Sequence, residues 1–109
     1  MNSIKESFDN LPAAVCFFDK RGVVRLMNRR MLSIGAELLG SGVQTLDELH
    51  RALDTPPESI ERLDAEMGVY KFPSGTVLRF VERQITDKSG GRYTEVTASD
   101  VTRLVTLQQ

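Results

Sequence analysis

The sequence predicts an α+β domain in which a five-stranded antiparallel sheet carries short helices on one face. Runs of β-branched and aromatic residues alternate with glycine-containing turns near both ends of the chain. Between these runs, residues 28–67 place apolar side chains at helical spacing behind residues that favour helix N-caps. This order of strands, helices and strands is typical of helices that pack together on one face of a sheet.

An N-terminal helix is predicted by a capping pattern and a narrow apolar stripe. Ser3–Glu6 has the spacing of a capping box, in which two side chains satisfy free backbone N–H groups. Ile4, Phe8 and Leu11 follow at positions i, i+4 and i+7, and Pro12 ends the helix.

Five strands are predicted from composition and from the turns that separate them. The run AAVCFF has no polar member, which indicates a strand covered on both faces. Asp19–Gly22 is expected to join it to a second strand, and two further glycine-containing turns separate the last three strands. The predicted strands comprise residues 13–18, 23–27, 68–72, 76–86 and 92–99.

Three short helices are predicted between the second and third strands. Asn28 is a typical N-cap, and the helix behind it is expected to end at Gly35 or Gly40. Thr45–Glu48 and Thr55–Glu58 repeat the capping-box pattern and predict two more helix starts. The apolar face predicted for the third helix is Ile60, Leu63 and Met67.

A terminal helix is predicted to leave the last strand. Asp100 is a good N-cap, and Val101, Leu104, Val105 and Gln108 follow at helical spacing. We therefore expect a domain over residues 1–99 and the start of a linker helix over residues 100–109.

Composition excludes several classes of protein. The 109 residues are enough for one domain, and 14 basic against 15 acidic residues give a net charge of −1, which favours neither nucleic acid nor an anionic membrane. No apolar run is long enough to predict insertion into a membrane. Cys16 is the single cysteine, which suits a reducing cytoplasm, and together with the single histidine, His50, it cannot fill a zinc site.

Three segments carry a resemblance to a known family. They read LPAAVCFFDKRGVVRLMN (Leu11 to Asn28), YKFPSGT (Tyr70 to Thr76) and ASDVT (Ala98 to Thr102). In this order they resemble a PAS domain, and the resemblance covers almost the whole chain. More narrowly, the segments NRRM and EVTASDVTRL look like the N-terminal PAS regions of bacterial sensor histidine kinases.

The resemblance implies a cytoplasmic input domain of a two-component system. Such a domain would be a homodimer and would pass a signal through the helix after Asp100 to a kinase that lies beyond Gln109. Asp100 and Thr102 would set the angle at which that helix leaves the sheet.

An alternative is a PAS dimerisation module with a filled core, attached to another output domain. A small enzyme on an unrelated α+β scaffold is the third hypothesis, although no nucleophile and base are visible as a pair.

The resemblance also implies a small-molecule pocket between the sheet and the helices. The same apolar side chains could instead fill the core, and Asn28 could serve only as a helix cap. The candidate pocket residues are Phe17, Leu26, Asn28, Met31, Leu32, Leu46, Leu49, His50, Leu53, Leu78 and Phe80. We expect no haem and no flavin, because His50 lacks partners for haem propionates and Arg29 stands where light-sensing PAS domains carry a reactive cysteine.

The two amphipathic terminal helices predict the dimer contact. A short helix with an unpaired apolar stripe needs a surface to pack against. The expected interface residues are Ile4, Phe8, Leu11, Val101 and Leu104, together with the outer sheet face. The alternative is a monomer whose first helix folds back over its own sheet. The five basic residues between Lys20 and Arg30 are interpreted as a solvated face.

Overall fold

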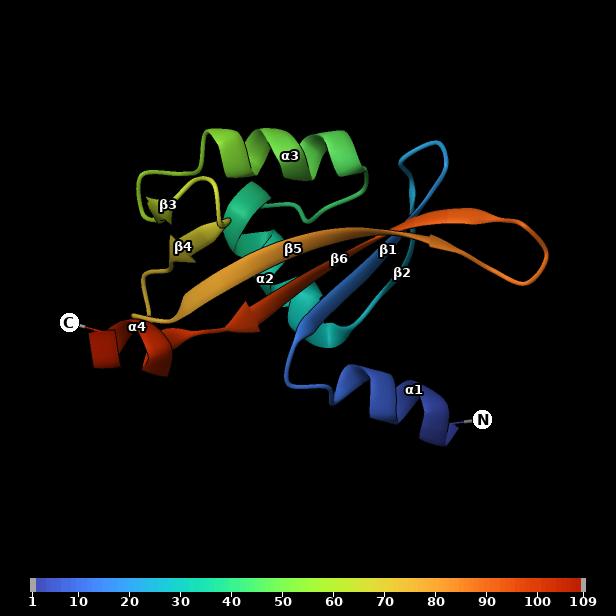
Figure 1. Ribbon diagram of the computed structural model, residues 1–109, viewed down its shortest axis with the longest axis horizontal. Coiled ribbons are helices and arrows are strands. Elements are labelled where there is room, and N and C mark those ends of the chain that lie inside the picture. The colour runs from blue at the N-terminus through green and yellow to red at the C-terminus, as the bar shows by residue number, and fades with distance from the viewer. Residues whose placement is uncertain (1, 109) are drawn as a thin grey trace.

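The computed structural model describes residues 2–108, which form a six-stranded antiparallel sheet and four helices (Figure 1). The strand order in the sheet is β2-β1-β6-β5-β4-β3, so that β6 and β5 are its two central strands and β1 flanks β6. The elements are α1 (Asn2–Asp9), β1 (Ala14–Asp19), β2 (Val24–Met27), α2 (Arg29–Leu39), α3 (Leu46–Asp54), β3 (Glu61–Asp64), β4 (Val69–Lys71), β5 (Val77–Thr86), β6 (Arg92–Asp100) and α4 (Thr102–Gln108).

The α+β class is confirmed, but the prediction of five strands and a third central helix is wrong. Residues 61–64 form β3, an edge strand that pairs with β4 through Glu61↔Lys71 and Arg62↔Tyr70. All four β3 residues are exposed, and the predicted helix face is divided, since Ile60 is buried in the core whereas Leu63 and Met67 are exposed. Pairing with the edge of β4 satisfies its backbone instead, which is a tertiary contact that overrides the local capping pattern.

The other local signals have mixed outcomes. The capping box at the start of α3 is confirmed: Thr45 Oγ1 accepts from the Glu48 N–H (3.2 Å), and Glu48 Oε1 accepts from the Thr45 N–H (2.9 Å). Helix α1 already includes Asn2, so Ser3 does not precede it, and the Ser3 side chain lies outside the described residues. Helix α2 continues through Gly35 and ends at Leu39, where Gly40 has a positive φ of 75°.

The core lies between α2, α3 and the inner face of the sheet. In β1, Ala14, Cys16 and Phe18 point to this face and are fully buried. Burial raises the pKa of the Cys16 thiol to about 12, which keeps it protonated and unreactive at neutral pH. Other buried members of the cluster are Met31, Ile34, Leu38, Val43, Leu49, Ala52, Ile60, Tyr70, Phe72, Leu78, Val96 and Ala98.

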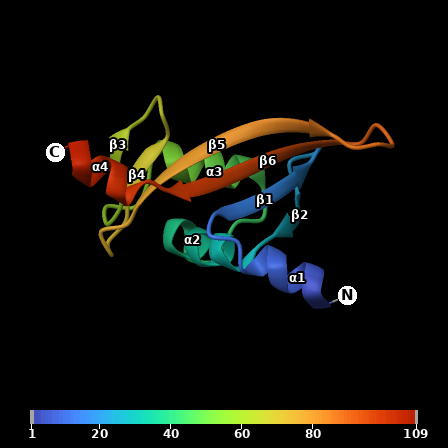
Figure 2. The ribbon, with the colours of Figure 1, turned by 60° about the horizontal axis from the view of Figure 1, so that its bottom comes forward.

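In Figure 1, α2 passes behind β5 and β6, so that the opposite, outer face of these two strands is turned toward the viewer. Strand register places Phe17 opposite Leu26 on β2 and opposite Glu95 on β6, on this outer face. Leu26 is 52% exposed, and Val81 on β5 is also exposed. Figures 1 and 2 show α1 and α4 toward different ends of the sheet.

No helix in the described part of the chain, residues 2–108, has the length and apolar character needed to cross a membrane.

Candidate functional site

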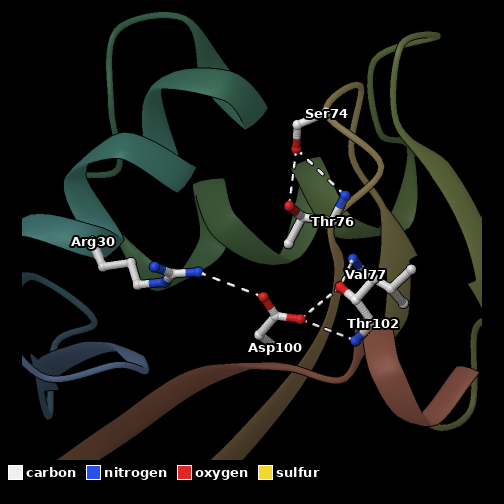
Figure 3. Close-up of polar contacts among 6 residues, drawn as sticks. All are labelled: Arg30, Ser74, Thr76, Val77, Asp100 and Thr102. Carbon is white, nitrogen blue, oxygen red and sulfur yellow. Dashed lines mark hydrogen bonds and ion pairs between the residues drawn. The ribbon is translucent and has the colours of Figure 1, made fainter.

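The start of α4 is attached to the end of β6 and the start of β5 by a compact hydrogen-bond cluster (Figure 3). Asp100 Oδ1 accepts from the Thr102 N–H (2.9 Å) and from the Thr102 hydroxyl. The same hydroxyl oxygen accepts from the Val77 N–H (2.8 Å), and the Val101 N–H donates to the Val77 carbonyl (2.8 Å). We call Asp100, Thr102, Val77 and Arg30 the β6–α4 junction.

Arg30 extends this junction to the helical layer. Its guanidinium lies 3.8 Å from the second oxygen of Asp100, and both side chains are about half exposed. Hydrogen bonds from Thr102 lower the pKa of Asp100, and the nearby charge of Arg30 lowers it further. Asp100 is therefore ionised at neutral pH, and four elements meet at the β6–α4 junction: α2, β5, β6 and α4.

The turn between β4 and β5 adjoins the junction. The Ser74 hydroxyl donates to Thr76 Oγ1 (2.9 Å) and accepts from the Thr76 N–H (3.4 Å), immediately before Val77 (Figure 3). The residue that follows this turn, Val77, is the one whose N–H and carbonyl bond Thr102 and Val101.

The structure separates the predicted pocket residues into three groups. Met31, Leu49 and Leu78 are buried in the core, and Leu46, Leu53 and Phe80 pack partly buried against it. Phe17 and Leu26 lie on the outer face, and Leu32 is 56% exposed. The space between helices and sheet is thus largely occupied by side chains.

An open cleft of about 320 Å³ remains between α3, β4 and β5, and the predicted residues Leu49, His50, Leu53 and Phe80 line it. His50 Nε2 lies 2.6 Å from Glu82 Oε1, which connects α3 to β5 at the edge of the cleft. Such a volume is at the lower end of the range for small-molecule sites.

Tyr70 also lines this cleft and connects β4 to α3. Its hydroxyl donates to the Leu53 carbonyl (2.7 Å), and its ring meets Phe80 edge to face at a centroid distance of 5.6 Å. Burial raises the pKa of the Tyr70 hydroxyl, so this group remains a hydrogen-bond donor at neutral pH.

Asn28 holds three segments together and has no spare hydrogen-bonding capacity for a ligand. Its Oδ1 caps α2 by accepting from the Met31 N–H (3.1 Å) and also accepts from the Val15 N–H (3.0 Å). Its amide nitrogen donates to the carbonyls of Ala13 (2.9 Å) and Phe8 (3.3 Å). The sequence indicated the cap, but nothing in it indicated the contacts with the ends of α1 and β1.

Sequence reasoning also missed several neighbours of the predicted sites. Arg30 at the junction and Glu82 beside His50 come from distant positions in the chain, and no local pattern marks either contact. Leu107 on α4 is 80% exposed and lay outside the predicted stripe.

No protein-family model matches this chain, and no curated protein matches it either. Within residues 2–108, no group of three or more His, Cys, Asp or Glu side chains is placed to hold a metal ion. The inference of function therefore depends on the fold, the β6–α4 junction and the exposed apolar side chains.

Proposed function

We propose that this chain is a PAS-type input domain of a cytoplasmic sensor histidine kinase, itself non-catalytic, that passes a signal to the kinase through α4. The observation that carries the proposal is the β6–α4 junction. The DVT segment that supports the resemblance to PAS domains supplies Asp100 and Thr102, whose hydrogen bonds attach α4 to the first residue of β5. The α+β architecture, in which α2 and α3 lie between β2 and β3 along the chain, is compatible with such a domain.

The junction has the properties of a relay between the helical layer and the output helix. The contact between Arg30 and Asp100 is long and half exposed, and pairs of this kind contribute little to stability. A shift of α2 could therefore break it at small cost, whereas the short bonds of Thr102 would keep α4 attached. The expected consequence is a change in the direction of α4 rather than its release.

The same proposal includes a homodimer. On α1, Ile4 is 78% exposed and Phe8 is half buried, while Leu11 is exposed but lies two residues beyond the helix, which ends at Asp9. On α4, Leu104 is 62% exposed, and Val101, which immediately precedes the helix, is half buried. Burying one Leu- or Ile-sized side chain contributes about 1.5–3 kcal/mol, and helices as short as these need tertiary contacts to persist. A two-fold arrangement that covers α1, α4 and the outer sheet face would supply them.

The dimer is tested by multi-angle light scattering. We expect twice the chain mass of 12.2 kDa, and we expect Ile4→Glu and Phe8→Glu to reduce it. Lys5→Glu places the same new side chain on α1 outside the apolar stripe and should leave the mass unchanged. A monomeric wild-type chain at high micromolar concentration would contradict this part of the proposal.

The relay is tested by placing the chain in frame ahead of a histidine kinase catalytic core that lacks its own input domain. Asp100→Asn and Thr102→Val should change the autophosphorylation rate without changing the dimer mass. Thr106→Val removes a hydroxyl one turn further along α4, where it bonds only the Thr102 carbonyl, and serves as the matched control. Equal rates for all four proteins would reject the relay.

A dimerisation module with a filled core is the second candidate. It is favoured by the packed inner face, where no buried side-chain nitrogen or oxygen of the described residues lacks a hydrogen-bond partner. Native mass spectrometry separates the two: a retained small molecule supports the sensory domain. An empty dimer whose junction variants leave the kinase rate unchanged supports the module.

A further inference from the structure

Two adjoining clefts at one end of the molecule are lined by cationic side chains from separate elements. One cleft, of about 630 Å³, lies between the β1–β2 turn and the start of β6. The other, of about 560 Å³, lies between the same turn, the start of α3 and β6. Figure 1 shows the β1–β2 turn and the β5–β6 hairpin at the same end of the sheet. We call the pair the basic clefts.

The cations converge from distant parts of the chain. Lys20, Arg21 and Arg92 line both clefts, Arg25 lines the first, and Arg51 of α3 lines the second. The sequence showed only the cluster near Lys20, whereas folding adds α3 and β6 to it. A half-buried aromatic residue, Tyr93, also lines both clefts.

Carboxylates neutralise only part of this charge. Asp19 accepts hydrogen bonds from the N–H groups of Arg21 (2.9 Å) and Val23 (3.1 Å) and from Arg25 Nε (2.9 Å). The bond from Val23 contributes most to lowering the pKa of Asp19, so this carboxylate is ionised and occupied within its own turn. Within residues 2–108, no carboxylate lies within 4 Å of the charged groups of Lys20, Arg21, Arg51 or Arg92.

The clefts therefore carry a local excess of positive charge. Five cations face two carboxylates, Asp19 and Asp47, which leaves an excess of three positive charges in a chain of net charge −1. Gathering like charges costs folding free energy, and a concave surface concentrates their field. A bound anion would relieve this repulsion, and guanidinium groups match phosphate oxygens in geometry.

The arrangement favours a compact anion with more than one phosphate group. Because three cations are shared by both clefts, a ligand that reaches from one cleft into the other meets all five cations. An extended polyanion or an anionic membrane would also meet the rest of the surface, which carries a net charge of −4 once the clefts are set apart. We propose that the basic clefts bind a small anion with two or more linked phosphate groups. This inference goes beyond the proposed function and does not depend on it.

The test is isothermal titration calorimetry of the whole chain with inorganic pyrophosphate, in metal-free buffer and with NaCl adjusted to constant ionic strength. We expect saturable binding with a Kd below about 1 mM. Orthophosphate should bind at least about fivefold more weakly, because it can occupy only one cleft. Titration with ADP then distinguishes a nucleotide from a free polyphosphate: tighter binding of ADP points to a nucleotide, and weaker binding points to the free anion.

Variants assign the binding to the clefts. Arg21→Gln and Arg92→Gln should each weaken pyrophosphate binding about fivefold, since each removes one charge–phosphate contact. Both residues are exposed, so the fold should persist, and unchanged circular dichroism checks this. Lys20→Gln gives an independent variant should either arginine variant unfold. Arg103→Gln makes the same substitution on α4, outside the clefts, and should retain the wild-type Kd.

Three results would overturn the proposal. The first is the absence of saturable heat with pyrophosphate. The second is an equal loss of affinity in Arg103→Gln, which would indicate attraction by net charge alone. The third is sedimentation with anionic lipid vesicles in the absence of pyrophosphate binding, which would assign the basic clefts to a membrane surface instead.

Discussion

Replacing Thr102 by valine removes one hydroxyl while keeping the shape of the side chain. In the native structure that oxygen accepts from the backbone N–H of Val77, a residue that is 4% exposed. Leaving a buried donor without an acceptor costs about 1–3 kcal/mol, and the partial exposure of Thr102 places the expected cost near 1–2 kcal/mol. For a domain of this size, such a loss lowers the Tm by roughly 5–10 °C.

Thermal and urea unfolding followed by circular dichroism measure this loss directly. Thr102→Ser keeps the hydroxyl and should restore most of the stability. Thr106→Val makes the same substitution one turn later, where the hydroxyl bonds an exposed carbonyl, and should change the Tm by less than about 2 °C. Amide exchange should rise at Val77 in Thr102→Val alone. If Thr102→Val and Thr106→Val unfold at the same temperature as the wild type, the hydroxyl does not attach α4 to β5, and the reasoning fails.

Three further predictions concern other parts of the fold. Gly68→Ala should destabilise the domain by roughly 2–4 kcal/mol, since φ is +71° and an added Cβ would lie 2.7 Å from the Phe80 carbonyl oxygen. Gly75→Ala, with φ of +92° and open space around it, should cost less in the same urea titration, and the reverse order would contradict the contact. The Cys16 thiol should resist a thiol reagent at pH 8 until the chain unfolds, because it is buried and protonated. Since folding raises the pKa of this thiol from 9.0, the free energy of unfolding should also fall as the pH rises above 9. Folding lowers the pKa of Asp100 below 3.8, so its stabilisation is complete above that pH and is lost as the pH falls through the folded value. Acid unfolding of Asp100→Asn should lack this component, and an unchanged acid profile would show that the carboxylate contributes nothing.

The elements that the sequence predicted correctly depend on short-range signals. The Thr45 capping box marked the start of α3, and Asn28 marked the start of α2, because each cap bonds N–H groups within three residues. The apolar run before Asp19 identified β1 in the same way. Where a local pattern competed with a distant partner, as at Thr55–Glu58, the capping signal misled: pairing of residues 61–64 with β4 decided the structure.

The side of the sheet to which each strand residue points could not be predicted from the sequence. The run AAVCFF has no polar alternation, so it could not show that Phe17 points away from the core; the pairing of Phe17 with Glu95 on β6 decides that. Likewise, Leu26 follows Phe17 to the outer face because the two are register partners. Hydrophobicity alone therefore selected candidate pocket residues from both faces of the sheet.

The sequence by itself determined the α+β class, the positions of most strands and helices, and the polar residues that begin α2 and α3. Only the tertiary structure decided that Arg30 meets Asp100, and that Arg51 and Arg92 join the cations of the β1–β2 turn. The physical reason is the separation along the chain over which each interaction acts. Caps, turns and apolar periodicity act over a few residues, whereas strand register and the approach of distant charges are set by packing the whole chain at once.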